Sequence, residues 1–308
     1  MFRSLGAVLL ACYALGQAQS QPVFRGRGDT VRVFATVLDH DGRLATDLSQ
    51  KDFEVRDDGK PQPITLFDNS PQPIRIVVML DVSGSMSGNL ALLRSASEAL
   101  FDRLRPDDLA RVGTFGKDVR IGPSFTSDRR ELLGELPNFI PPDAPTPLWR
   151  GVDEAMSTFA KEADERRVIL VLTDGKDTGS MDFRHKPSSE GSVIDRARDE
   201  DVMIYAVGMR SRYQHPRGMD LRQALLEDLP DPGLAKVAEE TGGGYTEIKP
   251  GQDLDAAFAR VADELHAQYL LGYAPPKRDG KVHKIDVRIN GAGGLKPRAR
   301  RSYVASKE

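Results

Sequence analysis

An almost unbroken apolar run at residues 74–80 ends in a cluster of side-chain oxygens, and this stretch constrains the fold more than any other. Such a run is typical of a central parallel strand that helices cover on both faces. Asp81 ends the run, Ser83 and Ser85 follow at alternate positions, and a helical segment is expected at residues 90–104. Three oxygens in one tight strand-to-helix turn can converge on one point. Mg²⁺ prefers such donors, in octahedral geometry at about 2.0–2.1 Å.

Two later segments add oxygen donors of the same kind. Residues 144–148, Ala-Pro-Thr-Pro-Leu, open a second expected helix at residues 146–160 and contain Thr146. Residues 168–175, Val-Ile-Leu-Val-Leu-Thr-Asp-Gly, predict a second buried strand that ends at Asp174. Ligands of such parallel sheets bind at the carboxyl ends of the strands, where Asp81 and Asp174 are both expected.

The three segments together resemble the metal-ion-dependent adhesion site of von Willebrand factor A (VWA) domains. The flanking segments are similar to a bacterial group of exported VWA-related proteins. The resemblance implies a divalent metal site, with Mg²⁺ preferred and Mn²⁺ or Ca²⁺ as alternatives. Its implied ligands are Asp81, Ser83, Ser85, Thr146 and Asp174. A different interpretation of each segment is purely local, because Ser, Thr and Asp also cap helices and form turns.

The expected fold is α/β, a doubly wound and mostly parallel sheet with helices on both faces, as in VWA and Rossmann-like folds. Strands and helices alternate over residues 74–267, which we interpret as the VWA domain. Residues 19–73 and 268–308 instead show the two-residue period of strands. We expect these two ends to pair into one small β-sandwich that carries the VWA domain as an insertion. The basic run at residues 296–301 is expected to form a solvated strand face.

The first 18 residues have the pattern of an export signal, with Arg3 before a short apolar run and small residues that favour cleavage near Ala18. The run is shorter than the roughly 20 apolar residues that span a bilayer, so no membrane span is expected. Cleavage would leave an exported protein, periplasmic or extracellular. A second interpretation is a lipoprotein, because Leu9-Leu-Ala-Cys12 resembles a lipobox and would place a lipid anchor on Cys12.

The charge and the ligand set favour protein binding. A net charge of −3 gives no general attraction to nucleic acid. The implied site has two carboxylates, so a bound divalent ion can accept a partner's acidic side chain. The sequence thus predicts a metal-dependent, adhesion-type binding module. A scaffold protein whose metal only stabilises the loops is the alternative. A metal-dependent hydrolase is less favoured, because the five histidines are scattered and form no H-E-x-x-H helix. We therefore expect no enzyme activity.

Overall fold

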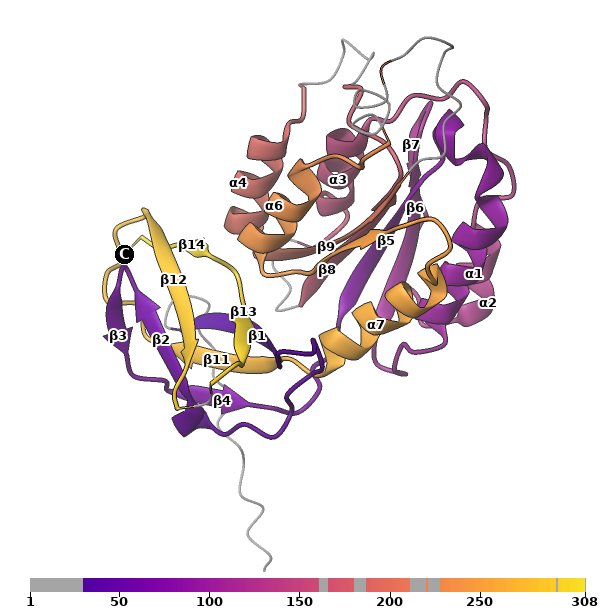
Figure 1. Ribbon diagram of the computed structural model, residues 1–308. Coiled ribbons are helices and arrows are strands. Elements are labelled where there is room, and N and C mark those ends of the chain that lie inside the picture. The colour runs from indigo at the N-terminus through magenta and orange to yellow at the C-terminus, as the bar shows by residue number, and fades with distance from the viewer. Residues whose placement is uncertain are drawn as a thin grey trace, which may run out of the picture.

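The computed structural model describes residues 30–160, 166–179, 187–210, 220, 228–291 and 293–307. Its centre is a six-stranded sheet in which five strands are parallel and the edge strand β7 is antiparallel (Figure 1). In spatial order the strands are β10 (Tyr245–Ile248), β9 (Val202–Met209), β8 (Arg167–Thr173), β5 (Arg75–Asp81), β6 (Leu109–Phe115) and β7 (Val119–Ile121). This confirms the predicted doubly wound, mostly parallel sheet.

Helices cover both faces of this sheet, which explains why its central strands are apolar throughout (Figure 1). On one face lie α1 (Leu90–Phe101), α2 (Arg129–Glu135) and α7 (Leu254–His266). On the other lie α3 (Leu148–Met156), α4 (Glu190–Glu200) and α6 (Gly233–Thr241). Every residue of β8 is buried, and in β5 only Arg75 is not. The described residues contain no helix long and apolar enough to cross a membrane.

Both ends of the described chain form two four-stranded antiparallel sheets (Figure 1). One has the order β13 (Lys296–Arg298), β1 (Val31–Leu38), β11 (Tyr269–Tyr273), β4 (Leu66–Asp68). The other has the order β14 (Ser302–Val304), β12 (Val282–Ile289), β2 (Phe53–Asp57), β3 (Lys60–Gln62). Residues of both sheets share one apolar core, which includes Val33, Val55 and Ile285. The predicted pairing of the two chain ends is confirmed, and we call this unit the sandwich.

Two local features set this arrangement. One is the turn of the β2–β3 hairpin, and the other is Gln268, which joins the sandwich to the sheet. Asp58 and Gly59 have φ of 46° and 78°, as the two central residues of a type I′ hairpin turn require. After α7, the Gln268 side chain donates to Thr36 Oγ1 at 2.7 Å and to Tyr205 Oη at 3.2 Å. A buried polar contact therefore fixes the sandwich against β9.

Several elements are shorter than the sequence predicts. The expected helix at residues 146–160 begins only at Leu148, after Pro147, and ends at Met156. The strand expected at residues 296–301 is also shorter, because β13 ends at Arg298 and β14 begins only at Ser302. The solvated basic face expected at residues 296–301 is wrong in part, because Arg298 contacts Tyr205 and Glu264, and Arg300 bonds to Asp201. The predicted export signal, Cys12 and Ala18 lie outside the described residues.

Candidate metal centre

Asp81 lies at the carboxyl end of β5 and is fully buried. Its Oδ1 accepts a hydrogen bond from the Ser83 backbone N–H at 2.7 Å. Its Oδ2 accepts one from the hydroxyl of Thr173, which ends the neighbouring strand β8. These two donors fix the carboxylate at the edge of the sheet where both strands end.

The two serines continue from Asp81 toward Asp174. Ser83 Oγ and Ser85 Oγ are 3.1 Å apart, and Ser85 Oγ donates to Asp174 Oδ1 at 2.6 Å. Asp174 follows β8 directly and is 2% exposed. Its second oxygen, Oδ2, is buried and has no hydrogen-bond partner. Four of the five predicted residues therefore form one connected cluster with Thr173.

Thr146 reaches the same region from the loop before α3. Its N–H donates to Thr178 Oγ1 at 3.0 Å, and its carbonyl accepts from the Thr178 N–H at 3.0 Å. A Cβ added at Gly175 would lie 3.1 Å from Thr146 Oγ1, which places that hydroxyl beside the residue that follows Asp174. The structure therefore brings Thr146, too, to the edge of the cluster.

Close backbone packing holds the first two loops together. The Gly84 N–H donates to the Ala144 carbonyl at 3.0 Å. A Cβ added at Gly84 would lie only 1.9 Å from the Pro142 carbonyl oxygen. Only glycine fits there without a shift of the backbone. The loop that contains Ser83 and Ser85 therefore packs directly against the loop that leads to Thr146.

The electrostatics of this cluster favour a bound cation. Burial, together with repulsion from Asp174, raises the pKa of Asp81 from 3.8 to about 7, although hydrogen bonds from Ser83 and Thr173 oppose the rise. Burial also raises the pKa of Asp174. Among the described residues, no lysine, arginine or histidine forms an ion pair with either carboxylate. Buried charges are normally paired or bound to a metal, so these residues fit a divalent cation.

Sequence reasoning missed the supporting residues Thr173, Asp177 and Thr178. Asp177 Oδ1 accepts from the Trp149 N–H at 3.3 Å, and its own N–H donates to Asp231 Oδ2 at 2.9 Å. These contacts tie the loop after β8 to the start of α3 and to the segment just before α6. The only signal in the sequence was position, since all three residues lie within four residues of Asp174.

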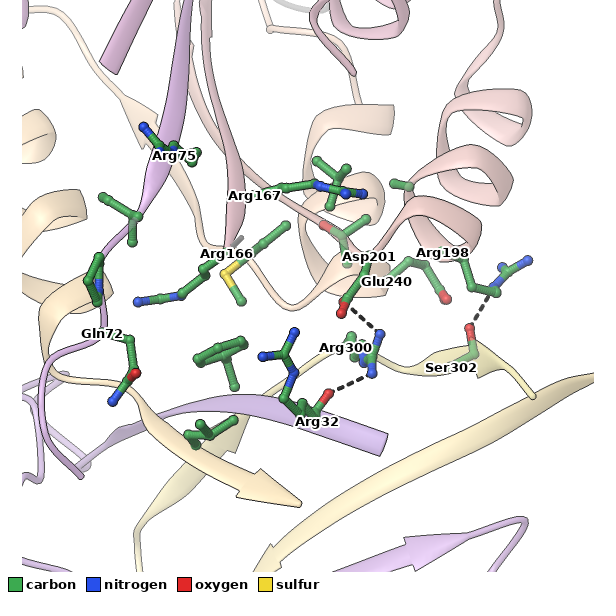
Figure 2. Close-up of a pocket in the computed structure, with 18 of the residues that line it drawn as sticks. Arg32, Gln72, Arg75, Arg166, Arg167, Arg198, Asp201, Glu240, Arg300 and Ser302 are labelled. Carbon is green, nitrogen blue, oxygen red and sulfur yellow. Dashed lines mark hydrogen bonds and ion pairs between the residues drawn. The ribbon is translucent and has the colours of Figure 1, made fainter. Parts of the chain in front are cut away.

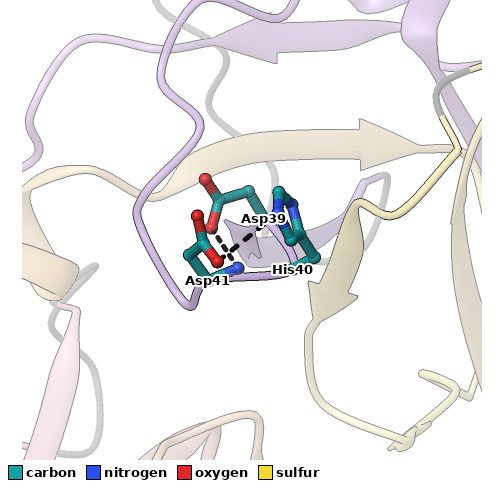
Figure 3. A group of neighbouring side chains, drawn as sticks. All are labelled: Asp39, His40 and Asp41. Atoms are coloured by element: carbon teal, nitrogen blue, oxygen red, sulfur yellow. Dashed lines mark hydrogen bonds and ion pairs between the residues drawn. The ribbon is translucent and has the colours of Figure 1, made fainter.

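Two other groups of acidic residues and histidine have different roles. Asp39, His40 and Asp41 form an exposed turn after β1, in which Asp39 Oδ1 accepts from the Asp41 N–H at 2.9 Å (Figure 3). In the sandwich, buried His283 bonds through Nδ1 to Asp57 Oδ1 at 2.8 Å. Neither group is part of the cluster around Asp81, and no described histidine is hydrogen-bonded to it.

The chain matches the von Willebrand factor type A domain over residues 76–231, and it belongs to that family. The match includes β8, all of β5 except Arg75, Asp174 and the loop that contains Thr146. It therefore confirms the family that the three sequence segments indicated.

Solved structures with similar folds have low sequence identity. The conserved hypothetical protein BatB from Bacteroides thetaiotaomicron is 16% identical, with a TM-score of 0.45, over 62% of this chain and 98% of that one. The von Willebrand factor type A protein from Catenulispora acidiphila is 13% identical, with a TM-score of 0.48, over 92% and 76%. Proximal thread matrix protein 1 from the mussel byssus, with a zinc-occupied MIDAS motif, is 16% identical, with a TM-score of 0.46, over 69% and 50%. A search of curated proteins found no match.

Proposed function

We propose that this VWA domain holds a divalent cation, Mg²⁺ by preference, and uses it to bind a protein partner that presents an acidic side chain. Its ligands, directly or through water, are Asp81, Ser83, Ser85, Thr146 and Asp174. The observation that carries the proposal is the buried Asp174 Oδ2, which has no hydrogen-bond partner although it lies beside hydroxyl groups and a second buried carboxylate.

The donor set explains why such an ion would bind a further carboxylate. Three of the five donors are neutral hydroxyls, so the formal charge comes from Asp81 and Asp174 alone. Thr173 and the Ser83 N–H hold one of these carboxylates in place. A partner carboxylate at the remaining coordination position would make a strong charge-assisted contact and fix the orientation of the complex. The bound ion attracts the partner's carboxylate, and this binding requires no catalytic turnover.

The proposal is tested with Mn²⁺, whose effect on water-proton relaxation reports an exchangeable coordination position. Metal-stripped protein is loaded with Mn²⁺, and acetate and then a short glutamate-containing peptide are titrated in. We expect saturable Mn²⁺ binding and a drop in relaxation as each carboxylate displaces water. The same peptide with glutamine in place of glutamate is the control and should have no effect.

The alternative function, a metal that only stabilises the loops, predicts a different result. Mn²⁺ would then bind and raise the unfolding temperature, but neither acetate nor the glutamate peptide would change the relaxation. That outcome would contradict metal-bridged partner binding and leave a structural role.

We also propose that the chain is exported, with cleavage near Ala18, and that it has no catalytic role. The support for export is the signal pattern of residues 1–18. Mass spectrometry of the secreted protein would identify its first residue: glutamine at position 19 supports cleavage after Ala18, whereas a lipidated Cys12 supports the lipoprotein alternative.

A further inference from the structure

A cavity of about 280 Å³ lies at the opposite end of the six-stranded sheet from the candidate metal centre. Strands β5, β8 and β9 begin at its wall, and Figure 2 shows that β1 of the sandwich closes the other side. The cavity therefore lies between the VWA domain and the sandwich. None of its lining residues is part of the proposed metal centre.

The lining of this cavity is strongly basic. Its arginines are Arg32, Arg75, Arg166, Arg167, Arg198 and Arg300. Its acidic residues are Asp107, Asp201 and Glu240, so six positive and three negative groups give a formal lining charge of +3. The chain as a whole has a net charge of −3. Walls of low dielectric strengthen the potential of one-signed charge in a cleft, so this cavity attracts anions although the protein as a whole does not.

Arg166 is buried, and its hydrogen-bond partners are neutral groups. It is 9% exposed, and its guanidinium lies over the Phe34 ring, 4.5 Å from the centroid. Its Nη1 donates to the Leu265 carbonyl at 2.7 Å and its Nη2 to the Gln268 side-chain oxygen, while Nε is buried without a partner. Among the described residues no carboxylate is hydrogen-bonded to it. Burial lowers its pKa to about 10, against weaker attraction from Tyr205 and Asp108.

Two further arginines are held in place by contacts between the sandwich and the VWA domain (Figure 2). Arg300 donates to Asp201 Oδ1 at 2.6 Å and to the Arg32 carbonyl at 2.6 Å, and its buried Nε has no partner. Arg198 Nε donates to Ser302 Oγ at 2.7 Å, and its Nη1 forms an ion pair with Asp195 Oδ1 at 2.8 Å. Their positions are therefore set before any ligand binds, which lowers the entropy cost of binding.

The same cavity also has an apolar wall, to which Phe34, Ile194, Met203 and Leu270 contribute. Small-molecule sites commonly combine such a lining with a few placed polar groups. We propose that the cavity binds a small organic anion, with a carboxylate or phosphate group beside an apolar body, and that this ligand bridges the VWA domain and the sandwich.

A purely structural role explains only part of the arginine set. Arg167 donates to the carbonyl of Glu200, the last residue of α4, and to the carbonyl of Ala160, which lies shortly after the end of α3. These bonds stabilise the ends of the two helical segments. Arg198 and Arg300 also have a structural role, because their bonds to Ser302 and Asp201 join the two units. Neither role accounts for the unpartnered Nε–H groups of Arg166 and Arg300, both of which line the cavity.

The test uses the full chain in the presence of a chelator, so that no phosphate can bind through a metal ion. Calorimetric titrations compare phenyl phosphate, benzoate, inorganic phosphate and benzyl alcohol. We expect one-site binding of phenyl phosphate or benzoate at least tenfold tighter than that of inorganic phosphate or benzyl alcohol. Whichever of the first two binds more tightly identifies the acidic group.

Variants separate the cavity from the rest of the surface. Arg166→Gln should weaken binding at least tenfold, and Arg198→Gln, which is more exposed and should fold, about threefold to tenfold. The matched control is Arg129→Gln on α2, whose surface pair with Asp102 lies away from the cavity. The proposal is overturned if phenyl phosphate and benzoate bind no tighter than inorganic phosphate and benzyl alcohol. It is also overturned if Arg198→Gln and the control bind equally well. Neither outcome depends on the metal centre.

Discussion

Replacement of Asp81 by asparagine should stabilise the metal-free protein and abolish its response to metal. Asparagine has nearly the same shape, and its side-chain oxygen can still accept from the Ser83 N–H. The rise of the Asp81 pKa from 3.8 to about 7 means that the ionised form costs folding about 4 kcal/mol above pH 7, at 1.36 kcal/mol per pH unit. Because the pKa is raised, this cost is absent below pH 3.8 and grows as pH rises toward 7.

The measurable gain should be about half of that limit, about 2 kcal/mol, because the Thr173 hydroxyl must turn to accept from the new amide. This corresponds to a rise in unfolding temperature of about 4–8 °C for a domain of this size. Saturating Mg²⁺ should instead make the wild type more stable than the variant. At a hundredfold excess over its Kd the ion stabilises the wild type by about 2.7 kcal/mol and leaves the variant unchanged.

Thermal unfolding at pH 8 in chelator and in excess Mg²⁺ measures both effects. The matched control is Asp108→Asn, at a buried carboxylate that accepts from the Ile74 and Arg105 backbone N–H groups. Burial opposes ionisation there too, but hydrogen bonds from His266 and these backbone groups lower its pKa, so this variant should be destabilised in both buffers. If Asp81→Asn is destabilised in chelator, or gains as much from Mg²⁺ as the wild type, the electrostatic account of the cluster is refuted.

Three further predictions follow from single contacts. Thr173→Val should weaken Mg²⁺ binding about tenfold by loss of the hydroxyl that orients Asp81, whereas Thr173→Ser should not, as a calorimetric titration would measure. Gly84→Ala should destabilise the fold by about 1–3 kcal/mol in urea unfolding, because its Cβ would overlap the Pro142 carbonyl; an unchanged midpoint would contradict this. Burial lowers the His283 pKa, but bonds to Asp57 and Asp279 outweigh it and raise the pKa above 6.5. The stability that protonated His283 contributes should be complete below pH 6.5 and lost as pH rises through the raised pKa, so His283→Gln should flatten this part of the pH–stability curve.

The sequence was sufficient to predict the central fold, because its signals there are local and strong. The apolar run of β5 ends in an aspartate and that of β8 is followed by one, and parallel strands bring their carboxyl ends to one edge of a sheet. Once both runs are read as neighbouring strands, the approach of Asp81 and Asp174 follows from geometry alone.

Contacts between distant segments could not be predicted in the same way. The role of Thr173 depends on which oxygen of Asp81 it faces. The basic run near the C-terminus alternates like an exposed strand, but Arg300 is only 14% exposed, because it lies against Asp201 and β1. The arginines of the cavity are separated by up to 268 residues, from Arg32 to Arg300, so only the folded chain shows that they converge.

The most direct test of the proposed metal centre is a calorimetric titration of Mg²⁺ into the metal-stripped protein, with Asp81→Asn and Ser83→Ala in parallel. The account predicts saturable binding at one site in the wild type, no binding in Asp81→Asn and weaker binding in Ser83→Ala. Equal binding by the wild type and Asp81→Asn would place the ion elsewhere. No binding to any of them, with and without added acetate, would mean that this buried cluster of carboxylates and hydroxyls holds no metal.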